Sequence, residues 1–162
     1  MLTTYQTLYH QSGLNIQNYE EEAESREYHA CRFTINGFKV IGRQAKITPT
    51  KTGQFVTSWQ RNKDGITEPF NEASGIDFLV IHVIKAGKMG QFIFPLARLI
   101  QKGIIHSATK AGKRGFRVYP PWDETTSKQA QKTQAWQLLY FVDLSDEVAG
   151  DFLKKTYANK TL

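Results

Sequence analysis

An Asn36-Gly37 pair between two strand-like runs constrains the fold more than any other feature of this sequence. Residues 28–35 and 38–47 are rich in the β-branched and aromatic side chains that favour strands. Asn-Gly supplies the positive φ angles that a two-residue hairpin turn needs. The sequence therefore predicts an antiparallel hairpin over residues 28–47.

Further strands and helices follow from hydrophobic period and from capping residues. The predicted strands cover residues 54–60, 76–84, 91–94 and 116–119. The predicted helices cover residues 2–9, 95–102, 127–134 and 145–157. Residues 15–26 read as a helix or turn, residues 62–75 as a polar loop, and residues 136–142 as a helix end or another strand. The expected fold class is α/β (α+β), with a largely antiparallel or mixed sheet of about five strands flanked by helices.

The chain length and composition fit one domain over residues 1–162. Of its 162 residues, 40% are hydrophobic, which is enough for a core and too many for a disordered chain. We find no apolar run long enough to span a bilayer and no signal peptide, so we expect a soluble, cytoplasmic protein. Cys31 is the only cysteine, so we expect a small core residue there rather than a disulfide or a metal ligand.

The net charge of +6 is unevenly distributed along the chain. Residues 1–27 carry five acids and one base, and residues 64–77 carry four acids and no base. Between and after them lie two acid-free segments, which we call the first basic stretch (residues 28–63, seven bases) and the second basic stretch (residues 78–117, eight bases). Such a distribution is typical of a protein that binds phosphates through a basic face.

Basic, aromatic and amide side chains occur together in both stretches and just after them. Lysine and arginine neutralise phosphates, whereas aromatic rings stack on unpaired bases. No helix-turn-helix is evident, so we expect backbone-dominated binding of single-stranded DNA or RNA with little sequence specificity. The candidate contact residues are Lys46, Lys51, Gln54, Trp59, Arg61, Lys110, Lys113, Arg114, Arg117 and Trp122.

Seven motifs in order resemble the MepB-like family of small bacterial proteins, over about residues 20–144. They are Glu24-Ser-Arg-Glu-Tyr28, Ala45-Lys-Ile-Thr-Pro49, Gly53-Gln-Phe-Val-Thr57, Gly65-Ile-Thr-Glu-Pro-Phe70, Gly90-Gln-Phe-Ile-Phe-Pro95, Gly112-Lys-Arg-Gly-Phe-Arg-Val-Tyr-Pro120 and Lys132-Thr-Gln-Ala-Trp-Gln137. The resemblance implies a core like that of restriction endonucleases, nucleic-acid binding, and a gene beside a multidrug efflux pump and its repressor. It does not imply a catalytic reaction.

A nuclease of the restriction type would need carboxylates to hold Mg²⁺ and a lysine near the attacking water. Gln44-Ala-Lys46 matches the last part of such a pattern, with Gln44 in place of the usual acid. Glu68 and Asp77 are candidate ligands from later in the chain, and an acid of residues 20–27 is a further candidate. Because the expected upstream acid is missing, we predict no metal and no cofactor, with Mg²⁺ only if the nuclease alternative holds.

Other functions have less support in the sequence. The four histidines lack the spacing of a zinc site, and the chain contains no nucleophile elbow, P-loop or dinucleotide-binding motif. A protein-interaction module that pairs its basic face with an acidic partner stays open as an alternative, as does a nucleotide-binding pocket. The sequence leaves the oligomeric state and the choice between DNA and RNA undecided.

Overall fold

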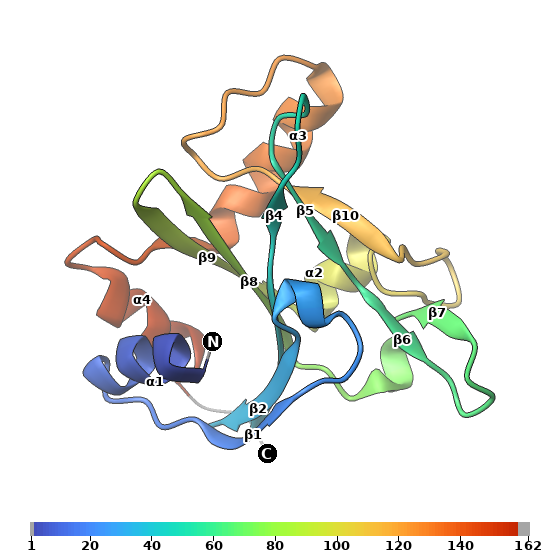
Figure 1. Ribbon diagram of the computed structural model, residues 1–162, viewed down its shortest axis with the longest axis horizontal. Helices are drawn as coiled ribbons and strands as arrows, with labels where there is room; N and C mark the ends of the chain where they lie inside the picture. The colour runs from blue at the N-terminus through green and yellow to red at the C-terminus, as the bar shows by residue number, and fades with distance from the viewer. Residues whose placement is uncertain (1, 159–162) are drawn as a thin grey trace.

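A six-stranded mixed sheet forms the centre of the computed structural model, which describes residues 2–158, and the side chains of residues 6–158 (Figure 1). The strand order is β1-β2-β3-β8-β9-β11, and only the β3–β8 pair is parallel. The fold is therefore a mixed α+β fold, as predicted. The strands are β1 (Gln17–Glu21), β2 (Cys31–Ile35), β3 (Phe38–Gln44), β8 (Phe78–Lys85), β9 (Lys88–Pro95) and β11 (Phe141–Asp143).

The predicted Asn-Gly hairpin joins β2 to β3. Asn36 has a φ of 49° and Gly37 a φ of 82°, the left-handed values that a turn of this kind requires. Ile35 pairs with Phe38 across the turn. The side chain of Asn36 also donates a 2.6 Å hydrogen bond to the carbonyl of Tyr157, so the turn is tied to the C-terminal helix.

Two smaller sheets lie beside the main sheet. One has the order β10-β5-β4, with β10 (Gly115–Val118), β5 (Gln54–Thr57) and β4 (Lys46–Ile47), and the other pairs β6 (Trp59–Arg61) with β7 (Thr67–Pro69). The predicted single strand over residues 54–60 is divided at Ser58, because the backbone changes partner there: the amide of Ser58 donates to the carbonyl of Arg114, and its carbonyl accepts from the amide of Phe70. The predicted polar loop over residues 62–75 is also wrong in part, since it contains β7.

Helices cover both faces of the main sheet. On one face, α1 (Leu2–Gln11) and α4 (Ala149–Thr156) enclose a core that contains Tyr9, Phe33 and Ile93. On the other face, α2 (Leu96–Gln101), α3 (Lys128–Gln137) and the β10-β5-β4 sheet enclose a core that contains Ile81, Phe94 and Phe116. Three short 3-10 helices complete the elements: η1 (Arg26–Tyr28), η2 (Glu72–Ser74) and η3 (Leu138–Tyr140).

Two further predictions need correction, one open prediction is decided and one is confirmed. Residues 15–26 contain the edge strand β1 rather than a helix, because Gln17 and Glu21 pair with β2. The last helix begins at Ala149 rather than after Ser145, because Ser145 bonds to Asp143 in a turn instead of capping a helix. Residues 136–142 hold both a helix end and the strand β11. Cys31 is buried in the core, as expected, and burial raises the pKa of its thiol to about 11.

No helix within residues 2–158 is both long and apolar enough to cross a membrane.

Candidate nucleic-acid interface

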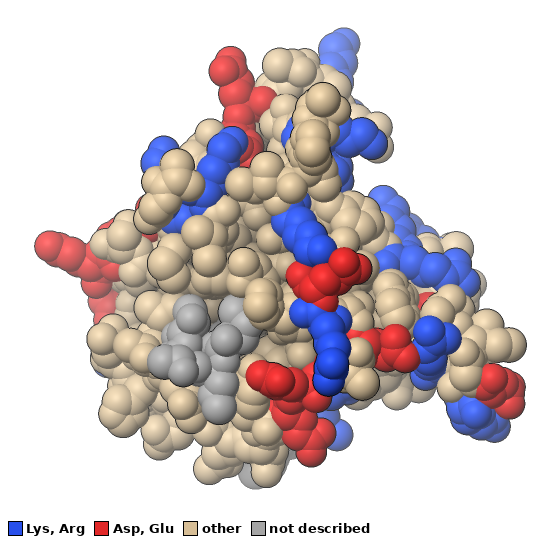
Figure 2. All heavy atoms as spheres, viewed as in Figure 1, with Lys and Arg blue, Asp and Glu red and all other residues tan. Residues whose placement is uncertain are grey.

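The acidic segment before β2 folds against the first basic stretch and neutralises much of it. Glu24 accepts a 2.5 Å hydrogen bond from Arg61, and Glu27 lies 3.0 Å from the ammonium of Lys46. Lys46 also lies over the ring of Tyr28, 4.6 Å from its centroid. Figure 2 shows this mixture on one face of the molecule, where acidic side chains lie between basic ones. Lys46 and Arg61 are therefore already paired with carboxylates.

Glu22 forms ion pairs with two more basic residues of the first basic stretch. Its carboxylate lies 2.6 Å from Arg32 and 3.4 Å from Arg43. The Arg43 side chain is 0% exposed, and burial lowers the pKa of its guanidinium while Glu22 raises it. A buried charge with one carboxylate partner depends on that partner for its stability. Arg43 is thus a structural residue that cannot reach an external phosphate.

The four candidate nuclease residues do not form one site. Lys46 is paired with Glu27, whereas Glu68 accepts a hydrogen bond from Gln60 in the β6–β7 sheet. Asp77 accepts a hydrogen bond from the backbone of Lys39.

Strand register separates Asp77 from Gln44. Gln44 lies opposite His82 on β8, and Asp77 precedes the start of that strand by one residue. Five residues of strand correspond to about 16 Å. Asp77 therefore lies at the other end of the sheet from Gln44.

This arrangement does not fit a magnesium centre. Among the described residues, no group of three or more His, Cys, Asp or Glu side chains is placed to hold a metal ion. Glu27, which lies beside the Gln44-Ala-Lys46 segment, is already engaged by Lys46. Mg²⁺ requires several hard oxygen ligands with near-octahedral geometry, which this cluster does not supply.

The second basic stretch is neutralised far less. Lys85 pairs with Asp123 at 2.8 Å. Four other bases donate to neutral oxygens of the protein, which fix the side chain but leave its charge uncompensated. These are Arg98 to Tyr140, Lys110 to the carbonyl of Gln101, Arg114 to the carbonyl of Thr67, and Arg117 to Thr48, Thr52 and Gly53.

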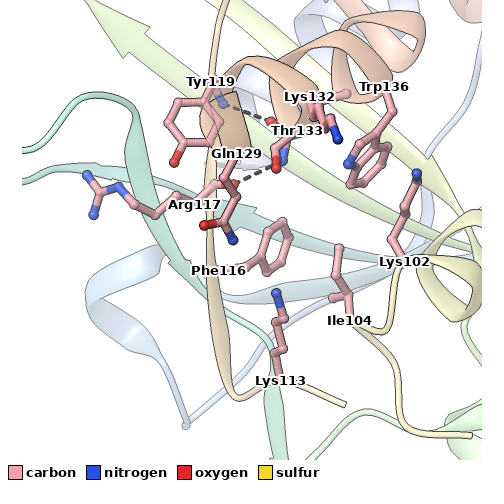
Figure 3. A pocket seen from close by; sticks show the side chains of 11 residues that line it. Lys102, Ile104, Lys113, Phe116, Arg117, Tyr119, Gln129, Lys132, Thr133 and Trp136 are labelled. Atoms are coloured by element: carbon pink, nitrogen blue, oxygen red, sulfur yellow. Dashed lines mark hydrogen bonds between the residues drawn. The ribbon is translucent and has the colours of Figure 1, made fainter. Parts of the chain in front are cut away.

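A hollow of about 440 Å³ lies between β10, α3 and the segment that follows α2, and we call it the lysine hollow (Figure 3). Lys102, Lys113 and Lys132 surround its floor, which is formed by Phe116 and Ile104. None of the described residues that line it is acidic. The Arg117 side chain starts at its wall but points away from it.

One face of α3 supplies the upper wall of the lysine hollow. Gln129, Lys132, Thr133 and Trp136 have the spacing i, i+3, i+4 and i+7, which places all four on the same side of a helix. Gln137 fixes the helix against β10, because its side chain accepts from the Tyr119 backbone and donates to the Arg117 carbonyl. Lys102 lies over Trp136, 5.5 Å from the ring centroid.

Lys102 and Lys132 are missing from the contact residues predicted from the sequence. The signal that marks Lys132 was present: the helix over residues 128–137 carries no acid, and its polar residues recur at helical spacing. Lys102 gave no such signal, since it follows a short helix and reaches the hollow only through the tertiary fold.

Several predicted contact residues have structural roles instead. Gln54 is 1% exposed and its amide faces the carbonyl of Ile84, so it is not available to a base. Trp122 is half-buried and packs edge-on against Phe141, with 5.7 Å between the ring centroids. The ring of Trp59 is contacted by Arg61. Lys51, in contrast, is exposed in the loop before β5.

Gly112, in the loop before β10, and Gly115, the first residue of β10, serve packing within the protein. A Cβ on Gly112 would lie 2.5 Å from the backbone of His106, and one on Gly115 would lie 2.4 Å from the ring of Phe55. In the structure they allow this segment to pack tightly, which fixes the backbone position of Lys113.

Comparison with known proteins gives one family and two solved structures. The MepB-like family model matches residues 22–143. The crystal structure of MepB matches with a TM-score of 0.80 and 32% sequence identity, covering 90% of this chain and 97% of that one. No curated protein matches.

A second solved structure, a bacterial homing endonuclease, matches less well. Its TM-score is 0.47 and its sequence identity is 13%, over 85% of this chain and 86% of that one. This similarity is too low to support a conclusion about function. The family match spans most of the chain and agrees with the range over which the seven motifs occur, so the chain belongs to the MepB-like family.

Proposed function

We propose that this protein binds nucleic acid through the lysine hollow and the basic residues around it, with low sequence specificity and a preference for single strands. The observation that carries the proposal is the absence of any acid among the described residues that line a hollow containing three lysines. Uncompensated lysines bind phosphate because they release condensed counterions from the strand.

The arrangement of the surrounding side chains favours single strands. The hollow presents the aromatic rings of Phe116, Tyr119 and Trp136 beside the lysines. An unpaired base can reach such rings, whereas a base inside a duplex is covered by its neighbours. Arg114 lies on the adjoining surface with Phe55 and Trp59, which extends the aromatic and basic surface beyond the hollow.

Fluorescence anisotropy of labelled single- and double-stranded oligonucleotides at two salt concentrations tests the proposal. We expect saturable, salt-sensitive binding that is tighter for single strands. The Lys113→Ala/Arg114→Ala variant removes two exposed charges at the interface, so it should bind more weakly. The Lys154→Ala/Lys155→Ala variant is the matched control, because it removes two exposed charges from α4 on the opposite face of the sheet.

The result separates the proposal from its alternatives. Absence of binding at low salt would contradict it and favour a protein or small-molecule partner. Equal loss of affinity in both double variants would assign binding to net charge rather than to this interface. Shortening of the oligonucleotide only with Mg²⁺, abolished by a chelator and by Lys46→Ala, would support the nuclease alternative.

A further inference from the structure

The lysine hollow is closed on more sides than a groove that tracks a strand. Phe116 and Ile104 form its floor, α3 forms one wall, and lysines enter from three separate segments (Figure 3). Its volume of about 440 Å³ lies within the range of roughly 300–1,000 Å³ that is usual for small-molecule sites. The hollow therefore has the size to receive one unit of a polymer.

The lining matches the parts of a nucleotide. Phe116, which is 8% exposed, forms an apolar floor, and the half-buried ring of Trp136 beside it offers a contact for a base. The side chains of Gln129 and Thr133 supply an amide and a hydroxyl above that floor. The ammonium groups of Lys113 and Lys132 have no partner among the described side chains and are free to bind an anion. Apolar lining with a few convergent polar groups is typical of a ligand pocket.

The charge of the hollow exceeds what one internal phosphate of a strand requires. A phosphodiester carries one negative charge, whereas a phosphomonoester carries about −1.5 to −2 at pH 7. Three lysines with no acid among the described lining residues complement the higher charge better. A terminal phosphate also places a nucleotide at the end of its strand, so that only one side of the hollow needs to admit the chain.

From these features we propose that the lysine hollow binds the terminal nucleotide of a single strand that ends in a phosphomonoester. The base lies over the Phe116 floor and against Trp136, and the terminal phosphate lies within reach of Lys102, Lys113 and Lys132. This inference rests on the proposed function and adds to it the part of the strand that the site selects. A free nucleoside monophosphate shares this chemistry and is the other source of such a ligand.

Binding of three matched single strands tests the inference: one with a 5′-phosphate, one with a 3′-phosphate and one with neither. We expect at least fivefold tighter binding of a phosphorylated strand than of the unphosphorylated one. A nucleoside monophosphate should compete for the site, and the nucleoside without phosphate should not. The Lys132→Gln variant should lose the preference for the phosphate, while Lys155→Gln on α4 should keep it.

Intrinsic tryptophan fluorescence gives a second readout. Trp136 lines the hollow, whereas Trp59 and Trp122 do not, so the phosphorylated strand should change a signal that Trp136→Phe removes. Equal affinity for all three strands, with no change at Trp136, would overturn the inference but leave the proposed function standing. Binding of the free nucleotide as tight as that of the phosphorylated strand would also overturn it and make the hollow a nucleotide site. Failure of every strand to bind at low salt would overturn both proposals.

Discussion

The two basic stretches carry similar charge but differ in what faces them. Four of the seven bases in the first stretch are paired with Glu22, Glu24 or Glu27. In the second stretch, one of eight bases is in an ion pair within the described chain, and the others keep their charge. A count of basic residues along the sequence therefore overstates the first stretch as a phosphate-binding surface.

The difference comes from the position of the acidic segment. The end of β1 and the residues that follow it are held beside β2, where Glu21 pairs with Cys31. The carboxylates of Glu22, Glu24 and Glu27 then lie within reach of side chains on β2, β3, β4 and β6. No comparable acidic segment among the described residues crosses α2, β10 and α3 at the lysine hollow.

The largest expected effect is a loss of stability when the carboxylate of Glu22, which pairs with the buried guanidinium of Arg43, is removed. Glu22→Ala leaves Arg43 charged and buried without its partner, so we expect the free energy of unfolding to fall by about 3–5 kcal/mol. Urea denaturation measures this change. Glu20→Ala on exposed β1 is the control and should have little effect; a similar small effect of Glu22→Ala would mean that water or another group stabilises Arg43.

Acidification affects the fold through His82, on the face of the sheet away from the hollow. Its side chain is 1% exposed, and burial lowers its pKa to about 4. The unfolded chain therefore takes up a proton below about pH 6.5 that the folded chain takes up only near pH 4. Stability should fall by about 1 kcal/mol per pH unit between these values and then level off for this group.

Denaturation curves from pH 7 to pH 4 measure this loss, and His82→Asn should make it shallower. An unchanged slope in that variant would assign the acid sensitivity to other groups.

The next effect tests the comparison directly, by removing two charges from each stretch. Lys102→Ala/Lys113→Ala should weaken single-strand binding about tenfold at low salt and reduce the slope of log K against log salt by about 1.4. Lys46→Ala/Arg61→Ala should change affinity much less, because Glu27 and Glu24 already compensate those charges. Anisotropy titrations over a series of salt concentrations measure both quantities. Equal losses would show that the two stretches contribute equally.

The smallest expected effect comes from removing carboxylates that neutralise the first basic stretch. Glu24→Gln/Glu27→Gln frees Arg61 and Lys46 while keeping the shape of both side chains, so we expect a gain in single-strand affinity of about twofold to fivefold. The same titrations detect it. Glu72→Gln/Glu147→Gln, which removes two exposed acids elsewhere on the protein, is the control for the same change in net charge. An equal gain in that control would show that net charge, rather than release of the first stretch, is responsible.

Local sequence predicted most of the elements because their causes are local. The Asn36-Gly37 turn, the strand over residues 78–85 and the helix capped by Ser127 depend on residues within a few positions of one another. The errors fall where distant partners decide the outcome. The strand divides at Ser58 because its backbone changes partner from the β10 side to the β7 side, and residues 17–21 form a strand because β2 offers a free edge.

By itself, the sequence determined the mixed α+β class, the hairpin, the family and the positions of the two acid-free basic stretches. Only the tertiary structure decided which bases keep their charge and which side chains share a site. It paired the acids of residues 22–27 with the first stretch, separated Asp77 from Gln44, and brought Lys102 and Lys132 to Lys113. The physical reason is that electrostatic interactions depend on distance in space, whereas sequence patterns report only the separation along the chain.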